Sequence, residues 1–288
     1  MGASVVAAYI QTYEATVRYL AQQGISRLRP WVQERSVQSE GHNWERLGKQ
    51  EAVQKTARLV ATPNQDYPWS TRKSIPVTYH TGDSTEQEDI VQMLIDPNSS
   101  IANAQGMAMK RAYDDEIIAN ATGDSRDGDG NAVPFPASQA LGDGTTAITF
   151  DLVTQVTELF LENDISSDEE KVFVISPAQV RKLLQLTEVT NADYNMLRPL
   201  MSGEIVQWMG YTWVCSTRLL SPTGDGSDVT CFAMTRKALG LQVNKDIWCK
   251  VQEDPSVSFA WRIYCASTYG AIRVEDEHIV SLDLSETI

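Results

Sequence analysis

Hydrophobic residues recur every three or four positions in several stretches of the chain, a period that places them on one face of a helix. The longest stretch begins at Asp96 and Pro97, an acid that caps a helix and a proline that fits its first turn. It continues to about Ala121, and Gly123 is typical of the residue that follows a helix. The predicted helices span residues 5–20, 97–121, 151–162 and 177–186.

Short runs rich in β-branched and aromatic residues lie between these helices and predict strands. Residues 171–175 are almost entirely apolar, which predicts a strand buried on both faces. Gly210 lies within a longer strand-like region. Because glycine often marks a break in a strand, we expect the region to be interrupted there. Helices and strands alternate, so the sequence predicts an α+β body. The remaining predicted strands are 203–217, 229–234, 248–252, 259–266 and 278–284.

The first quarter of the chain is too polar to build a core of its own. Residues 21–48 are predicted to form an extended arm. Two strand-like runs follow, 56–62 and 74–80, and together they predict a hairpin. Pro76 excludes the second run from the centre of a sheet, because proline has no amide hydrogen to donate. A hairpin alone is marginal in water, so we expect this one to be stabilised by a partner.

Aromatic side chains beside positive charge are typical of protein interfaces, and the predicted hairpin holds both. Two acids near the end of the longest helix, Asp114 and Asp115, oppose the helix dipole. Either they belong to a solvated helix face, or they receive basic groups from a neighbouring copy, such as Arg58, Arg72 or Lys73. The candidate subunit-interface residues, including the two tryptophans of the arm, are Trp31, Trp44, Arg58, Tyr67, Trp69, Arg72, Lys73, Asp114 and Asp115.

Charge is divided unevenly along the chain. Residues 1–82 hold ten Lys and Arg against six Asp and Glu, a net charge of +4, whereas residues 83–288 hold fourteen against thirty-two, a net charge of −18. A basic arm joined to an acidic body favours association with the body of another copy. The overall net charge of −14 disfavours a surface that binds the phosphates of nucleic acid. The pattern predicts a lattice-forming protein.

No stretch approaches the roughly eighteen apolar residues that a membrane helix needs, and no signal peptide is recognisable, so we expect synthesis in a cytoplasm and no membrane partner. The four cysteines lack the short paired spacing of a zinc knuckle. We therefore expect buried, reduced thiols rather than metal ligands or disulfides at Cys215, Cys231, Cys249 and Cys265.

Residues that could support catalysis are sparse. The three histidines, His42, His80 and His278, are not accompanied by a nucleophile motif. Asp127 and Asp129 resemble the start of a calcium loop, but the glycine and the bidentate acid that complete this motif are missing. A flexible turn is favoured over a metal site, and a metal-dependent hydrolase that uses these two acids is kept as an alternative. We expect no catalytic residue, no metal and no cofactor.

Several short motifs follow one another in a recognisable order. They are residues 20–30 (LAQQGISRLRP), 93–97 (MLIDP), 108–118 (AMKRAYDDEII), 174–179 (VISPAQ), 191–194 (NADY), 203–211 (GEIVQWMGY), 269–274 (YGAIRV) and 279–280 (IV). In this order, and over nearly the whole chain, they resemble the major capsid proteins of tailed bacteriophages with the Hong Kong 97 fold. The resemblance implies an N-terminal arm (1–48), an extended hairpin loop (49–83), a peripheral domain with a spine helix (84–147), an axial domain (148–256) and closing strands of the peripheral domain (257–288).

The resemblance also implies a function. Copies of such a protein form pentamers and hexamers of an icosahedral shell around double-stranded DNA, which the protein encloses without sequence-specific binding. It implies a virion protein assembled in the host cytoplasm, with a separate scaffold protein, a portal and, in some relatives, decoration proteins as partners. Lys55 and Lys73 lie in the region where some relatives crosslink, but no motif identifies a crosslinking partner. The alternative is a cellular nanocompartment shell of the same fold, which encloses protein instead of DNA.

Overall fold

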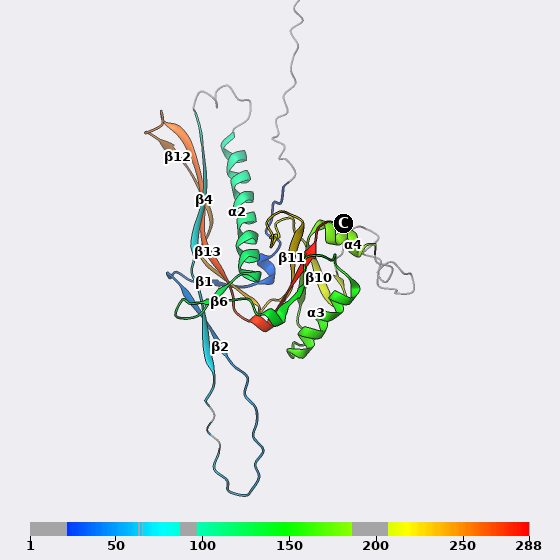
Figure 1. Cartoon of the computed structure of the whole chain (residues 1–288). Coiled ribbons are helices and arrows are strands. Elements are labelled where there is room, and N and C mark those ends of the chain that lie inside the picture. The colour runs from blue at the N-terminus through cyan, green and yellow to red at the C-terminus, as the bar shows by residue number, and fades with distance from the viewer. Residues whose placement is uncertain (1–21, 63, 65, 87–96, 186–206, 288) are drawn as a thin grey trace, which may run out of the picture.

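The computed structural model of the chain describes residues 22–62, 64, 66–86, 97–185 and 207–287. These residues form two sheets with flanking helices, and a long loop projects away from both sheets (Figure 1). The helix expected over residues 5–20 lies outside the described residues. No helix in the described part of the chain is long and apolar enough to cross a membrane.

One half of the structure is a four-stranded sheet with a long helix beside it. Its strands, in spatial order, are β1 (Gln33–Ser36), β12 (Leu239–Asp254), β13 (Ala260–Arg273) and β4 (Val77–Thr85), and the helix is α2 (Pro97–Thr122). α2 runs along the sheet (Figure 1). The ring of Tyr113 on α2 stacks on Tyr269 of β13, with ring centroids 3.8 Å apart, and Tyr79 of β4 stacks on the same Tyr269 at 4.9 Å. This aromatic stack joins the helix to the sheet.

The other half is a six-stranded sheet with two shorter helices. Its strands, in spatial order, are β7 (Ala140–Gly142), β14 (Ile279–Ser285), β11 (Asp228–Thr235), β8 (Lys171–Ile175), β10 (Tyr211–Cys215) and β9 (Gln207–Trp208). The helices are α3 (Phe150–Glu162) and α4 (Pro177–Leu183). Each begins at a capping hydroxyl: Thr149 accepts a hydrogen bond from the Leu152 amide, and Ser176 accepts one from the Gln179 amide. All five residues of β8 are buried, because apolar side chains cover both of its faces.

The remaining elements are small and connect these halves. The strands β2 (His42–Leu47) and β3 (Trp69–Ser74) pair antiparallel at the base of the projecting loop. The other short elements are β5 (Ser125–Arg126), β6 (Ala132–Val133) and the 3-10 turns η1 (Arg29–Trp31), η2 (Ala137–Gln139) and η4 (Asp276–His278).

Most of the predicted body elements are confirmed. α2 and α3 match the predicted helices to within a residue at each described end, and β8 has the predicted bounds. Gly210, at φ +79°, separates β9 from β10 as expected. α4 ends at Leu183, earlier than predicted. The strands β12 and β13 are much longer than their predicted cores, because the exposed polar half of β12 still pairs with β13.

The predicted hairpin strand over residues 56–62 is wrong. These residues form no strand, and the hairpin is made by β2 and β3 instead. The apolar residues of the predicted run, among them Leu59 and Val60, are exposed and gain no burial from pairing. β2 pairs despite its polar sequence because one residue, Trp44, is buried against the four-stranded sheet. Pro76 lies between β3 and β4, and β4 is an edge strand, in accordance with the exclusion from the sheet centre.

The sheets do not follow the residue ranges of the expected domains. β12 falls within the expected axial range 148–256, but it pairs with β13 and β1 in the four-stranded sheet. β14 falls within the expected closing strands of the peripheral domain, but it pairs with β11 and β7 in the six-stranded sheet. The last third of the chain therefore crosses between the two halves twice.

The expectation of four reduced cysteines is also wrong. Cys249 and Cys265 form a disulfide, whereas Cys215 and Cys231 are free. The two bonded residues are 16 apart in sequence, and they become direct neighbours only because β12 and β13 pair with Cys249 opposite Cys265. Sequence spacing carries no trace of this register. Burial raises the pKa of the Cys231 thiol to about 12, and it raises the pKa of Cys215 as well.

We predict that Leu282→Ala destabilises the subunit by about 2–5 kcal/mol, because Leu282 of β14 is fully buried and alanine leaves a cavity. The matched change Leu161→Ala, at a leucine of α3 that is mostly exposed, is expected to cost less than about 0.5 kcal/mol. Urea unfolding followed by tryptophan fluorescence measures both. Equal losses for the two variants would contradict the placement of the core.

Candidate assembly surface

The projecting loop, residues 48–68 between β2 and β3, extends well away from the rest of the molecule (Figure 1). Every described residue from 47 to 70 is exposed. Several of these residues are apolar, and Leu59 is 89% exposed. Clustered exposed apolar side chains mark interaction surfaces, since water contact is costly for them. The exposed large apolar residues of the loop and its flanks are Leu47, Val53, Leu59, Val60, Tyr67 and Trp69.

A buried tryptophan fastens the base of this loop to the four-stranded sheet. Trp44 of β2 lies over Gly240 of β12, where a Cβ atom would come within 2.6 Å of the indole ring. It also packs with Ile272 and Val274. The indole Nε1 donates a hydrogen bond to the Ser74 hydroxyl at 3.2 Å. The glycine at 240 is therefore required by the tryptophan above it.

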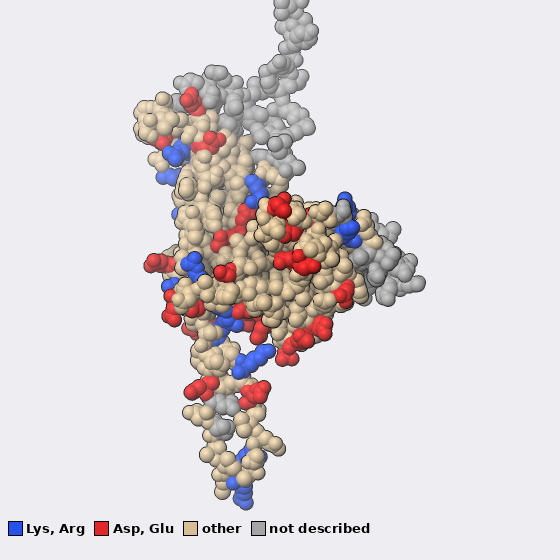
Figure 2. All heavy atoms as spheres, in the orientation of Figure 1, with Lys and Arg blue, Asp and Glu red and all other residues tan. Residues whose placement is uncertain are grey.

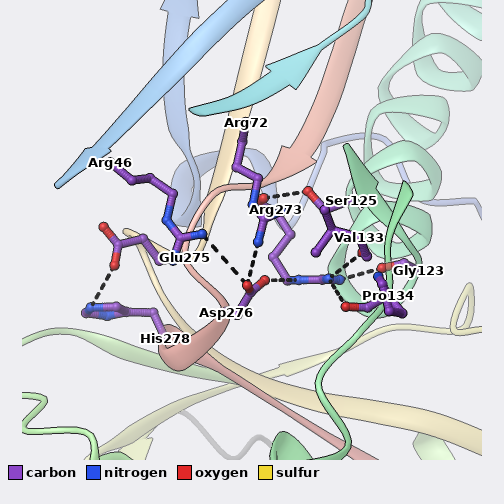
Figure 3. Close-up of polar contacts among 10 residues, drawn as sticks. All are labelled: Arg46, Arg72, Gly123, Ser125, Val133, Pro134, Arg273, Glu275, Asp276 and His278. Carbon is purple, nitrogen blue, oxygen red and sulfur yellow. Dashed lines mark hydrogen bonds and ion pairs between the residues drawn. The ribbon is translucent and has the colours of Figure 1, made fainter. Parts of the chain in front are cut away.

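A single carboxylate joins the loop base to the end of β13. Figure 3 shows three guanidinium groups converging on Asp276 of η4. Arg72 of β3 and Arg273 of β13 each reach one of its oxygens at 2.6 Å, and Arg46 of β2 lies 3.8 Å away. Arg72 is buried, and this burial lowers its pKa while Asp276 opposes the shift. We call Asp276 with these three arginines the loop-base cluster.

Arg273 is the most deeply buried member of the loop-base cluster. Its side chain is fully buried, and its guanidinium also donates to the backbone carbonyls of Gly123, Val133 and Pro134 (Figure 3). Gly123 directly follows α2, and Val133 ends β6, so the cluster connects the loop base to the end of the helix and to β6 as well as to the sheet. A buried charge is stable only when it is paired and hydrogen-bonded, and Arg273 meets both conditions.

A second carboxylate, this one buried, holds the arm. Asp114 of α2 is 1% exposed and accepts hydrogen bonds from the Ser26 hydroxyl at 2.6 Å and from the backbone amides of Arg27 and Leu28 at 3.0 and 3.2 Å. The Gln23 amide also donates to it. Leu28 is fully buried in the core between α2 and the sheet. The described arm is thus bound to the spine of its own chain.

The structure gives partners within the subunit to the two acids near the end of α2. Asp114 binds the arm, and Asp115 pairs with Arg218. Arg72 pairs with Asp276 of its own chain. A contact of these acids with Arg58, Arg72 or Lys73 of a neighbouring copy stays a prediction.

The other interface candidates differ in how accessible they are. Trp44 is buried, and Trp31 and Lys73 are half-buried. The remaining candidates, which are exposed and accessible to a second copy, are Arg58, Tyr67 and Trp69.

The residues that fix the loop were not among those predicted from the sequence. Asp276 lies between Glu275 and Glu277 in a polar stretch, and such acids are usually solvated. Arg273 ends a strand of mostly buried residues. Because arginine is rarely buried unless it is paired, its place in this strand is the one local sign that a partner such as Asp276 exists.

The aspartate loop that resembles a calcium site closes on itself. Asp127 accepts hydrogen bonds from the amides of Asp129 and Asn131 and from the Asn131 side chain, and the last of these is the main cause of its lowered pKa. This is the geometry of an Asx turn. Within the described residues, no group of three or more His, Cys, Asp or Glu side chains is placed to hold a metal ion.

Comparison with known proteins identifies the family. A family model described as phage capsid protein matches residues 5–286, nearly the entire chain. The chain belongs to the phage capsid protein family. As a capsid protein it is a component of the virion, where copies of it form the shell. No curated protein matches the sequence.

Solved capsid structures share the fold of this capsid protein. The capsid protein of Cyanophage Pam1 superposes with a TM-score of 0.76 at 11% identity, covering 99% of each chain. The capsid of Cyanophage P-SCSP1u gives 0.75 at 14% identity, covering 96% of this chain and 93% of that one. The capsid of Ralstonia phage GP4 gives 0.74 at 10% identity, covering 99% and 98%. The fold is the mixed helix and strand, Hong Kong 97-like capsid fold, which confirms the resemblance seen in the sequence.

We predict that Asp276→Ala destabilises the capsid protein by about 3–5 kcal/mol, because Arg273 and Arg72 are then buried without a counter-charge. Urea unfolding measures the loss. Asp254→Ala, which breaks an ion pair with the exposed Arg262, serves as the matched control and is expected to cost about 1 kcal/mol or less. A loss at Asp276 no larger than at Asp254 would contradict the role of the cluster.

We predict that Asp114→Ala releases the arm from α2, because the buried amide of Leu28 loses its acceptor. Hydrogen exchange at Arg27 and Leu28 should become faster, and trypsin should cleave after Arg27, since Pro30 protects the bond after Arg29. Asp115→Ala is the control, since its partner Arg218 lies on the surface and the arm contacts stay intact. Unchanged protection of Leu28 in the Asp114 variant would show that the arm is held by other contacts.

Proposed function

We propose that copies of this capsid protein assemble into pentamers and hexamers of an icosahedral shell that encloses double-stranded DNA of a tailed phage. The observation that carries the proposal is the projecting loop: its base is fixed by Trp44 and Asp276, whereas its apolar residues are exposed on the isolated subunit. A rigid base with an exposed apolar end is suited to reaching a second subunit, where the loop gains the burial that its own chain does not provide.

The distribution of charge supports the same contact. Lys and Arg side chains lie at the far end of the loop, whereas Asp and Glu side chains gather over the part of the surface formed by the six-stranded sheet and its helices (Figure 2). Opposite charges on loop and body favour a head-to-tail contact between copies, and such contacts close into rings when the rotation between subunits permits. Pentamers and hexamers are rings of this kind.

The acidic body supports DNA packaging without adhesion. A net charge of −14 repels phosphates, so a shell of such subunits would let packaged DNA enter and leave without tight binding to the wall. We propose that assembly takes place in the host cytoplasm and needs a separate scaffold protein and a portal, with decoration proteins as further partners of the finished shell. The role is structural, and no catalytic step is assigned to any residue.

The test is to express the full chain with and without the neighbouring genes of its phage and to image the purified material by negative stain. Regular closed particles built from five-fold and six-fold clusters are expected, and phage-derived particles should contain DNA. Particles filled with protein cargo and free of DNA would favour the nanocompartment alternative. Monomers under all conditions, with and without the scaffold, would overturn the proposal.

We predict that the double charge reversal Lys55→Glu and Arg58→Glu at the end of the loop prevents particle formation at low salt, while the subunit keeps its unfolding midpoint. Both residues are exposed, so reversal changes the contact and not the fold. Lys250→Glu, an exposed lysine on β12, is the matched control and should still assemble. Light scattering against salt concentration measures assembly. Normal assembly of the loop variant at every salt concentration would show that the proposed contact does not depend on electrostatic pairing.

A further inference from the structure

The disulfide between Cys249 and Cys265 lies in the distal half of the β12–β13 hairpin, away from the core. β1 pairs with residues 240–243 of β12, so within the described residues β12 beyond Val243 has a strand neighbour on one side only. The first part of β12, residues 239–243, is buried, whereas residues 248–254 are half-buried or exposed. Register shifts between Val243 and Trp248 separate the two parts. The distal half of β12 is therefore an edge with little apolar burial of its own.

The disulfide supplies what this edge lacks. It ties the exposed Cys249 on β12 to the fully buried Cys265 on β13, the strand that α2 covers. A crosslink across a hairpin removes unfolded conformations and so stabilises the paired state. The other side-chain links of the distal half of β12 are surface contacts, such as the edge-on contact of the Trp248 and Tyr264 rings, whereas the facing part of β13 is also held by β4 and by buried residues such as Ile263. Without the crosslink, the distal half depends on these contacts and on backbone hydrogen bonds.

We propose that Cys249 and Cys265 form a redox-dependent staple, open as a dithiol while the subunit is made in a reducing cytosol and closed by oxidation once an oxidant reaches the folded protein. A glutathione-buffered cytosol keeps such pairs reduced, which is why the bond is absent during synthesis. The pairing of β12 with β13 needs no bond, because Cys249 and Cys265 are brought opposite each other by the register of the hairpin. The dithiol is thus pre-aligned for closure.

The chemistry selects this pair among the four cysteines. An oxidant of the low-molecular-weight disulfide class, such as glutathione disulfide, exchanges with the Cys249 thiolate, forming a mixed disulfide and releasing one small thiolate. The Cys265 thiolate then attacks the Cys249 sulfur and releases the second. Two protein thiols are oxidised and one small disulfide is reduced to two thiols. Cys231 is fully buried on β11 and Cys215 is half-buried on β10, both in the other sheet, so neither competes for the exposed Cys249.

The experiment uses the full chain purified under reducing, oxygen-free conditions and then treated with excess glutathione disulfide. Peptide mass spectrometry is expected to find one crosslink, between the peptides of Cys249 and Cys265, with Cys215 and Cys231 still free. Hydrogen exchange in residues 245–268 should slow, and the Tm should rise by about 5 °C or more. Reduction of the wild type by a phosphine should reverse both effects, so the result does not depend on a variant that folds.

Two variants serve as controls. Cys249→Ser with Cys265→Ser should show neither the Tm rise nor the slower exchange on oxidation, whereas Cys215→Ser should behave like the wild type. Four free thiols after oxidation, or a crosslink that leaves exchange and Tm unchanged, would overturn the proposal. The timing of closure rests on the proposed assembly in a cytoplasm. These measurements are made on the free subunit, however, and do not require assembly. A failure to form the disulfide would therefore leave the proposed shell function untouched, and a failure to assemble would leave the disulfide result untouched.

Discussion

The carboxylate of Asp276 is the contact on which the placement of the projecting loop depends. It receives Arg72 and Arg46 from the two strands at the loop base and Arg273 from the end of β13. Arg273 in turn donates to the carbonyls of Gly123, directly after α2, and of Val133 and Pro134. The two strands of the loop base and the end of β13 therefore meet at one carboxylate. Because removing that charge leaves buried guanidinium groups unpaired, the arrangement is held by the penalty for breaking it more than by the net gain of making it.

A buried carboxylate holds the arm in a similar way. Asp114 satisfies two backbone amides of a segment that has no regular hydrogen-bonding partner of its own, and Leu28 fills the core beside it. Two acids, the buried Asp114 and the half-buried Asp276, thus anchor the arm and the loop base. The end of the loop has no such anchor, and its apolar side chains remain exposed on the isolated subunit. The subunit is anchored by paired charges up to the loop base, and its loop is exposed beyond that point, as expected of a subunit whose final contacts come from its neighbours.

The fold was predictable where apolar residues follow a clear period. The all-apolar run of β8 and the capped helices α2 and α3 could be placed from local signals, because burial and capping act over a few residues. The strand β2 could not, since its polar sequence pairs only because Trp44 finds a glycine on β12, almost two hundred residues later. Asp276 was missed because two of its arginine partners, Arg46 and Arg72, come from strands about two hundred residues away. The Cys249–Cys265 bond was missed because it depends on the register of the β12–β13 hairpin, which irregularities between Val243 and Trp248 shift.

The link between β3 and β4 has a mechanical consequence. Only Ile75 and Pro76 separate the second strand of the loop base from the edge strand of the four-stranded sheet, and proline fixes the backbone there. β4 pairs with β13 along its whole length, from Val77 to Thr85. Tension applied by a neighbour at the end of the loop is therefore transmitted as shear along β4 into the spine of the subunit, and does not dissipate in a flexible joint. Swelling or contraction of a shell would therefore load the pairing of β4 with β13 directly.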